Sequence, residues 1–349
     1  MTIAWQAHTR GIEVAEANSA AEFIEALRPS NRHWWDGDRD EASSWVFRGH
    51  AQAEWPLLPT AWRPNKVIAS AAREAARRFD VVKPSQTLSW FPSNFITAPG
   101  DFEQLELTKP LTIATTAEYI PIWDFARRCD ELGMNVPLAG TAPDPIQHPN
   151  WLPTPEYPLS GDELLRFTDF PEALALAQHH GIPTRLLDWT RNPMAAAFFA
   201  VEPLRKPEPK ARLVVWALHK RHAGEVHVEG VKFPYGNDTV GVNPAIMVFR
   251  PPTRNNPFLA AQAGLFTTIT GSGIYYMKKG GKRPSLEGFV AEAKPASTVL
   301  RQISLSHEHA ADLIEILRKE NVSRSALMPT TDNVARDVLT MWEQQQDLG

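Results

Sequence analysis

Polar side chains suited to holding a ligand are concentrated between residues 178 and 190, where they stand at the two ends of an apolar stretch. Arginine offers a planar fork of donors that matches a phosphate or a carboxylate, and glutamine can donate and accept at once. These residue types favour a site for a nucleotide or a molecule of similar polarity. The candidates in this segment are Gln178, His179, Arg185, Asp188 and Thr190.

Arg48 is a further candidate, because it ends an apolar segment that predicts a strand and is followed by Gly49. Its guanidinium could bind a diphosphate, and the glycine would leave room beside the backbone. The alternative is a structural arginine that pairs with Asp188 or Asp36.

Two other candidates also have a purely structural alternative. Thr190 precedes a predicted helix, so its hydroxyl could bind an anion or a ribose hydroxyl, or it could simply cap that helix. Gln178 suits an amide or the edge of a base, and its alternative is a cap at the end of the preceding helix.

The surrounding pattern predicts the elements that position these groups. Gly181 and Pro183 end a helix that begins near Pro171, and residues 184–189 predict a short buried strand. Asn192 caps the next helix. Because polar groups at the ends of apolar strands converge at a sheet edge, we predict one cleft that contains Arg48, Gln178, Asp188 and Thr190.

The segments 44–63 and 178–190 together resemble the FRG domain family, which is named for a Phe-Arg-Gly motif. Here that motif is Phe47, Arg48 and Gly49, followed as in the family by Trp55 and the Leu-Leu-Pro run 57–59. A Gln-His-x-Gly-x-Pro-Thr-Arg-Leu-Leu-Asp-Trp-Thr signature spans residues 178–190. A third, shorter match consists of Arg254, Gln262, Gly264, Phe266 and Thr267. The resemblance covers roughly residues 40 to 330.

The order of these motifs is also similar to that of ADP-ribosyltransferases of the Arg-Ser-Glu type. In this comparison Arg48, Thr190 and Gln262 take the catalytic positions, and NAD is the implied cofactor. The implied cofactor-binding residues are Arg48, Gly49, Gln178, His179, Arg185 and Asp188. Gln262 or Gly264 stands where those enzymes have a glutamate, and a neutral amide supplies no countercharge to a cationic transition state. Glu287 and Glu292 are the nearest carboxylates in the sequence.

These resemblances imply an FRG-domain protein with a nucleotide-binding cleft that performs NAD-dependent ADP-ribosyl transfer in bacterial defence or as a toxin. The alternative is a non-catalytic module that senses a nucleotide or a nucleic acid. The sequence leaves open whether the chain is catalytic, and whether a target would be a protein or a nucleic acid.

Composition excludes several other classes. The net charge of −4 over 349 residues gives no basic field for an extended nucleic-acid surface. The single cysteine, Cys129, excludes an intrachain disulfide framework and fits a reducing cytoplasm. No apolar run approaches the ~20 residues that span a bilayer, so we expect no membrane partner. No metal is expected either, because the adjacent His179 and His180 would point about 100° apart on a helix.

The order of elements predicts an α+β fold with a mixed or antiparallel central sheet and flanking helices. An ADP-ribosyltransferase-like arrangement is one form that such a sheet could take. We expect a single FRG-type domain over residues 1–349, with its core at about 40–330 and a helical and proline-rich insertion at about 65–160. Predicted helices cover 20–28, 65–80, 111–132 and 333–344. Predicted strands cover 212–219, 245–250, 265–270, 273–277 and 297–304.

Overall fold

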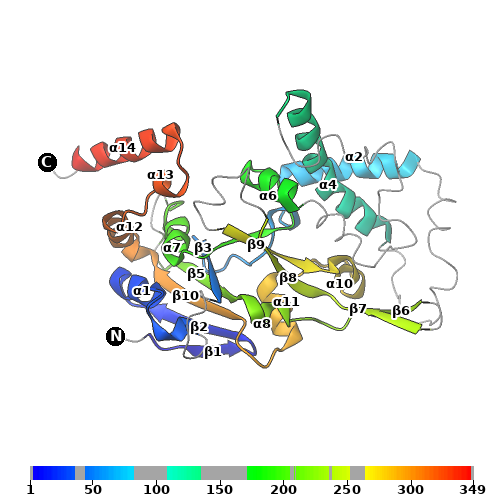
Figure 1. Ribbon diagram of the computed structural model, residues 1–349, viewed down its shortest axis with the longest axis horizontal. Coiled ribbons are helices and arrows are strands. Elements are labelled where there is room, and N and C mark those ends of the chain that lie inside the picture. Colours follow the sequence, from blue (N-terminus) through cyan, green and yellow to red (C-terminus); the bar gives the residue numbers. More distant parts are fainter. Residues whose placement is uncertain are drawn as a thin grey trace.

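The computed structural model describes residues 3–35, 44–81, 108–134, 171–204, 208, 210–235, 238–251 and 264–346. It confirms the α+β class: an eight-stranded mixed sheet is flanked by helices, as Figure 1 shows. A separate two-stranded hairpin, formed by β6 (Val231–Tyr235) and β7 (Asp238–Val242), extends from one end of the molecule.

The sheet has the strand order β1-β2-β10-β5-β3-β4-β9-β8. All neighbours are antiparallel except β2 and β10, which are parallel. The strands are β1 (Gln6–Thr9), β2 (Ile12–Ala17), β3 (Trp45–His50), β4 (Leu187–Thr190), β5 (Arg212–His219), β8 (Ala245–Phe249), β9 (Gly264–Thr270) and β10 (Leu300–Ser306). The two segments that carry the FRG motifs therefore form neighbouring strands, β3 and β4, near the middle of the sheet.

Each face of the sheet is covered by helices that bury an apolar side. On one face, α1 (Ala20–Leu27), α7 (Pro193–Val201) and α12 (Ala310–Lys319) pack over side chains such as Phe47 and Leu213. On the other face, Val46 and Trp216 lie in a second core with residues of α11 (Leu286–Ala293) and α8 (Lys220–Gly224). The alternation along β3 sends Phe47 to the first core and Val46 to the second, as the two-residue period of a strand requires.

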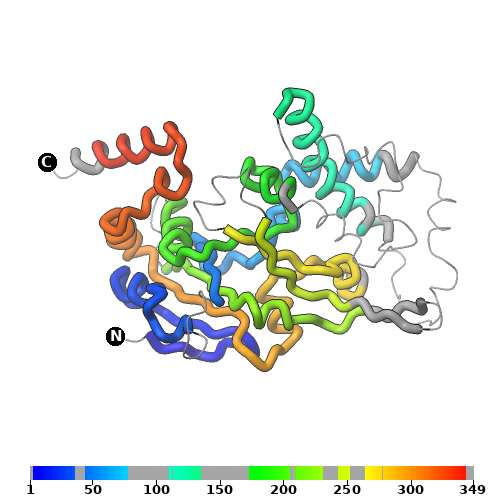
Figure 2. Tube along the Cα trace, in the orientation of Figure 1, coloured from blue at the N-terminus to red at the C-terminus, as the bar shows by residue number. Residues whose placement is uncertain are grey.

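The helices α2 (Lys66–Val81) and α4 (Thr108–Glu131) pack against each other beyond the β9 side of the sheet. In Figure 2 this pair lies beside α6 (Pro171–His179), and α4 shares with α6 a third apolar cluster that includes Ile122, Leu174 and Phe266. The helices occupy the helical part of the predicted insertion. Its proline-rich part lies outside the described residues, and the domain boundaries themselves stay a prediction.

The last described elements are α13 (Arg324–Leu327) and α14 (Thr331–Gln346). The helix α14 confirms the helix predicted at 333–344. Among the helices of the described residues, none is both long and apolar enough to traverse a lipid bilayer.

Two local predictions need correction. Residues 273–277 were predicted as a strand but form α10 (Ser272–Lys278), because Gly271, with φ of 63°, turns the chain out of β9 and into a helix. The strand predicted at 184–189 begins only at Leu187, because the Thr184 hydroxyl accepts a hydrogen bond from the Leu186 amide and holds a turn there. The polar edge strand β1 had no signal in the sequence.

Gly49 sets the distance between β3 and α7. A Cβ at this position would lie 2.0 Å from the Ala196 carbonyl oxygen and 2.6 Å from the Ala200 amide nitrogen, both atoms of the helix backbone. The glycine is therefore required by close approach of the helix, and the room that its missing side chain leaves is filled by α7. It does not leave the space beside Arg48 that the sequence suggested for a diphosphate.

Gly49→Ala should lower the free energy of unfolding by about 1 to 3 kcal/mol or more, because an added methyl group must displace a helix backbone. Urea denaturation followed by circular dichroism measures this loss. Gly224→Ala is the matched control, since a Cβ there would meet no atom within 4 Å. Equal stability of the two variants would show that α7 yields easily and that Gly49 is not needed for packing.

Candidate functional site

A cavity of about 360 Å³ opens where β3, β4 and β9 meet α6 and α7. It brings together six of the residues singled out from the sequence: Arg48, Gly49, Gln178, His179, Asp188 and Thr190. Apolar groups form the remaining wall, and these are Phe47, Ala175, Trp189, Ala196, Phe199, Gly264, Leu265 and Phe266. We call this cavity the junction cleft.

The cleft exists because β3 and β4 separate almost as soon as they meet. Their ladder is a single residue pair, Phe47 opposite Thr190, whereas β3 pairs with β5 along its whole length. Beyond this pair, the Nη1 of Arg48 donates to the Asp188 carbonyl oxygen at 2.9 Å and to its Oδ1 at 2.6 Å. The Arg48 side chain thus takes the place of the backbone hydrogen bonds that the separated strands cannot make.

His50 holds the other side of the Arg48 guanidinium. The Nε of Arg48 donates to Nε2 of His50 at 3.0 Å, and the His50 Nδ1 faces the Trp55 carbonyl oxygen at 3.3 Å. Since arginine only donates and a carbonyl only accepts, the proton of His50 must lie on Nδ1. Burial, then the positive charges of Arg48 and Arg63, lower the pKa of His50 to about 3. The imidazole is therefore neutral and acts as a fixed acceptor.

Asp188 presents its carboxylate to the cleft. Its side chain is 63% exposed, and its Oδ1 accepts from Arg48 and from the Nε2 of Gln178 at 3.1 Å. Desolvation raises the pKa of Asp188, but the charge and hydrogen bond of Arg48 oppose it more strongly and leave that pKa below its usual value. The Oδ2 makes no hydrogen bond within the part of the chain that the structure describes, so an ionised oxygen is available to a ligand.

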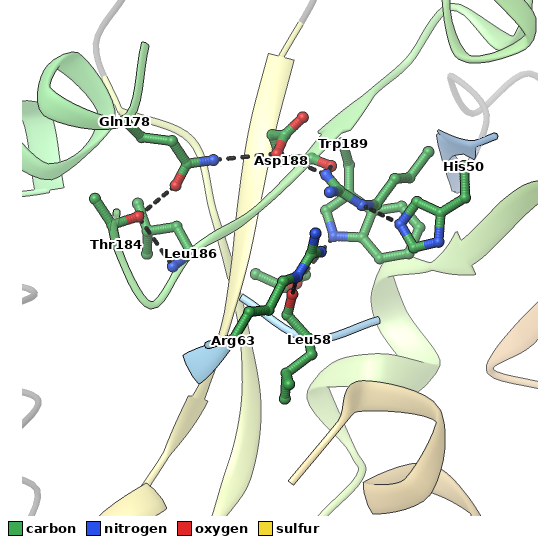
Figure 3. Close-up of polar contacts among 10 residues, drawn as sticks. His50, Leu58, Arg63, Gln178, Thr184, Leu186, Asp188 and Trp189 are labelled. Carbon is green, nitrogen blue, oxygen red and sulfur yellow. Dashed lines mark hydrogen bonds and ion pairs between the residues drawn. The ribbon is translucent and has the colours of Figure 1, made fainter. Parts of the chain in front are cut away.

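Hydrogen bonds to neighbouring residues hold the Gln178 side chain in place. Its Oε1 accepts from the hydroxyl of Thr184, and that hydroxyl accepts from the Leu186 amide at 3.2 Å. Figure 3 shows this chain of contacts leading from Leu186 through Gln178 to Asp188. Gln178 therefore orients the carboxylate, a role that neither the base-edge hypothesis nor the helix-cap hypothesis foresaw.

Thr190 supports the cap of α7 but is not the cap itself. Its Oγ1 accepts from the Asn192 amide at 3.0 Å, and the Asn192 side chain accepts from the amides of Met194 and Ala195. The first amides of α7 are thereby satisfied within the chain. His179 lines the cleft, and burial followed by the charge of His180 lowers its pKa.

Arg185 does not line the cleft, which corrects its assignment as a cofactor-binding residue. Its side chain is 1% exposed, and its Nε donates to Oε2 of Glu118 at 2.9 Å. Glu118, in α4, also accepts from the Trp62 indole at 3.0 Å and from Arg283 at 3.3 Å. Arg185 thus ties the signature segment to the helical insertion through a carboxylate 67 residues away.

The third motif is only partly described. Arg254 and Gln262 lie outside the described residues, as does Asp36, so the role of Gln262 stays a prediction. Gly264 and Phe266 line the cleft. The hydroxyl of Thr267 accepts from the buried Trp189 indole at 2.9 Å and so supports the wall of the cleft from within.

Neither downstream glutamate lies in the cleft. Glu287 accepts from the Leu57 amide at 3.0 Å, and Glu292 accepts from the Tyr275 hydroxyl and pairs with Lys279. Among the described residues, the carboxylate that lines the cleft is Asp188. Within the described ranges, no group of three histidine, cysteine, aspartate or glutamate side chains could hold a metal ion.

Sequence reasoning missed His50 and Arg63. The signal for His50 was its position two residues after Arg48, because alternate residues of a strand lie on the same face. For Arg63 the sequence offered only its place at the end of the first motif segment, after the buried Leu57.

The fold and the cleft define an α+β protein that presents a carboxylate fixed by an arginine where two central strands part. The FRG domain model matches residues 160–209, which contain the whole signature segment and α7. This segment of the chain therefore matches the FRG domain family, as its motifs predicted. No curated protein and no solved structure matches the chain, and no comparison supports the similarity to ADP-ribosyltransferases.

Glu118→Ala should destabilise the fold by about 3 to 5 kcal/mol, because removing one member of a buried ion pair leaves uncompensated charge. Glu118 is 3% exposed. Chemical denaturation measures the loss. Glu131→Ala on the same helix is the control, since that side chain is 55% exposed in its pair with Arg127 and should cost less than about 1 kcal/mol. Similar losses in both variants would contradict a dedicated role for Glu118.

The low pKa of His50 predicts a pH-dependent stability. Below pH 6.5 the unfolded chain takes up a proton at this imidazole, and the folded protein does not until about pH 3. The free energy of unfolding should therefore fall as the pH is lowered through this window, by up to about 1.4 kcal/mol per pH unit from this group. His50→Gln keeps an acceptor for Arg48 but removes the titration. Denaturation at pH 6.5 and 4.5 should show a smaller decrease for the variant, and equal decreases would count against a buried neutral His50.

Proposed function

We propose that the junction cleft binds a nucleotide, with NAD as the first ligand to test. The observation that carries this proposal is the Asp188 carboxylate, which is held by Arg48 and Gln178 and leaves its Oδ2 open to the cleft. A ribose offers two neighbouring hydroxyl donors, and an ionised carboxylate is a strong acceptor for such groups. Because the carboxylate is fixed before binding, little ordering cost opposes the contact.

The walls of the cleft support the same proposal. A volume of about 360 Å³ lies within the range of roughly 300 to 1,000 Å³ that small-molecule sites occupy. Three aromatic rings in the wall suit a base: Phe199 is half-buried, and Phe47 and Phe266 are buried. Apolar walls with a few convergent polar groups are typical of a ligand site.

This proposal gives Arg48 the second of the two parts that the sequence left open, that of an arginine paired with Asp188. Its Nε and Nη1 are engaged with His50 and Asp188, so it acts first as the residue that positions the carboxylate. A lysine could not make these contacts together, because its ammonium is a single point of charge and lacks the planar fork.

Asp188→Asn should weaken NAD binding about tenfold to a hundredfold, the equivalent of about 1.5 to 3 kcal/mol for a hydrogen bond to a charged group. Isothermal titration calorimetry with NAD, ADP-ribose and adenine measures the effect, and adenine, which lacks the ribose, should lose nothing. Asp124→Asn, a half-exposed carboxylate on α4, is the control. Equal NAD affinities in wild type and Asp188→Asn would refute the assigned role of the carboxylate, and absence of NAD and ADP-ribose binding would refute the nucleotide proposal.

ADP-ribosyl transfer is a second candidate, because Asp188 supplies in the cleft the negative charge that Gln262 cannot supply. In this reaction the bond between the ribose C1′ and nicotinamide breaks, nicotinamide leaves with the electron pair, and a nucleophile of the target bonds to C1′ and releases its proton to water. A nearby carboxylate stabilises the cationic transition state.

The assay for transfer uses labelled NAD, purified protein and a bacterial lysate, with label counted separately on protein and on nucleic acid. Transfer that is lost in Asp188→Asn, with the variant folded, would support an enzyme of defence or toxin type. Binding of NAD without release of nicotinamide would exclude transfer and favour the non-catalytic sensing module.

A further inference from the structure

Three donor nitrogens near Asp188 have no acceptor among the residues that the structure describes. Arg63 donates from its Nε to the Leu58 carbonyl oxygen at 2.7 Å, and its two terminal nitrogens make no hydrogen bond to any described residue. The same holds for Nη2 of Arg48, whose other two nitrogens are engaged. In Figure 3 the guanidinium of Arg63 points toward Asp188.

The positive charge around these donors exceeds the negative charge. Arg48 pairs directly with Asp188, and the pKa of Arg63 is lowered by burial first and then by the charge of Arg48, with Asp188 opposing. Two guanidiniums therefore lie near one carboxylate, and of the two only Arg48 pairs with it directly. His50, the nearest other titratable group on β3, is neutral and contributes no compensating charge.

The position of Arg63 is fixed by contacts of the two residues that precede it. The amide of Ala61 donates to the Thr184 carbonyl oxygen at 3.1 Å, which pins this segment to the signature segment. The Trp62 indole donates to the buried Glu118 at 3.0 Å. A half-buried arginine held in this way keeps its planar fork oriented at little entropic cost to a ligand.

We propose that Arg63 and Nη2 of Arg48 form an anion subsite that takes a phosphate group of the ligand. A phosphate has several acceptor oxygens with the spacing of a guanidinium fork, and its negative charge balances the excess of the arginine pair. This proposal identifies the charged group of the nucleotide that is bound, and in this respect it rests on the proposed function. The carboxylate then holds the ribose, and the two arginines hold the phosphate.

The subsite is tested with three probes: inorganic pyrophosphate, ADP and adenosine. Calorimetry at low ionic strength should show ADP binding to the wild type at least about tenfold more tightly than adenosine. Arg63→Gln should remove most of this difference, a loss of roughly 10- to 100-fold for ADP, and should leave adenosine unchanged. Arg63→Lys keeps the charge without the fork and should lose an intermediate amount. Arg73→Gln, an exposed arginine on α2, is the matched control and should behave as wild type.

Pyrophosphate separates this proposal from the nucleotide proposal. If pyrophosphate binds the wild type and Arg63→Gln weakens it, the subsite stands even where neither adenosine nor NAD binds, and only the nucleotide function fails. If ADP binds Arg63→Gln and wild type equally, the subsite is overturned while nucleotide binding stands. Equal binding of pyrophosphate to both proteins overturns the subsite by itself, and the NAD titration then decides the nucleotide proposal. Failure of both anions to bind the wild type overturns the subsite as well. Should Arg63→Gln fail to fold by circular dichroism, the same comparisons are made with Arg63→Lys.

Discussion

The structure depends on one contact, the hydrogen-bonded ion pair between Arg48 and Asp188. Strands β3 and β4 share a single residue pair, so the backbone alone gives the middle of the sheet little continuity at this point. The Arg48 guanidinium restores it by donating to both the carbonyl and the carboxylate of Asp188. Each strand is secured on its outer side, β3 by β5 and β4 by β9, so both sides of the opening are anchored in the sheet.

The cost of this arrangement is the desolvation of an arginine and the exposure of a carboxylate. A buried ion pair is weak evidence for stability, since an apolar pair of similar volume often serves equally well. Here the pair is half in water: Arg48 is 15% exposed and Asp188 is 63% exposed. The arginine works as an internal support, while the carboxylate remains free to meet a ligand. This division of roles is what makes the junction a candidate site.

A second ion pair, between Arg185 and Glu118, also supports the fold, but neither of its side chains is exposed. Glu118 and Arg185 are both buried, and they join the α2–α4 helices to the residues just before β4. Trp62 reaches the same carboxylate from the segment that carries Arg63. The helical insertion, the first motif and the signature segment therefore share one buried acceptor, so a shift in any of them would be felt by the other two and by the Arg63 side chain.

The sequence by itself determined the elements whose causes are local. Ser19 and Asn192 cap α1 and α7 because a side-chain oxygen satisfies amides two or three residues on, and the apolar run of β5 needs no distant partner to be recognised. The motif order also pointed to Arg48 and Asp188 as neighbours.

Only the tertiary structure decided what each polar group does. Arg48 and Asp188 are 140 residues apart, and Arg185 finds its partner 67 residues away, so no local pattern could distinguish the arginine that lines the cleft from the fully buried one. The same limit explains residues 273–277, where a short apolar run fits a helix and a strand equally well and the turn at Gly271 decides between them. Hydrogen bonds within an element follow from sequence spacing, whereas the pairing of charges across the sheet follows from which strands meet and where they part.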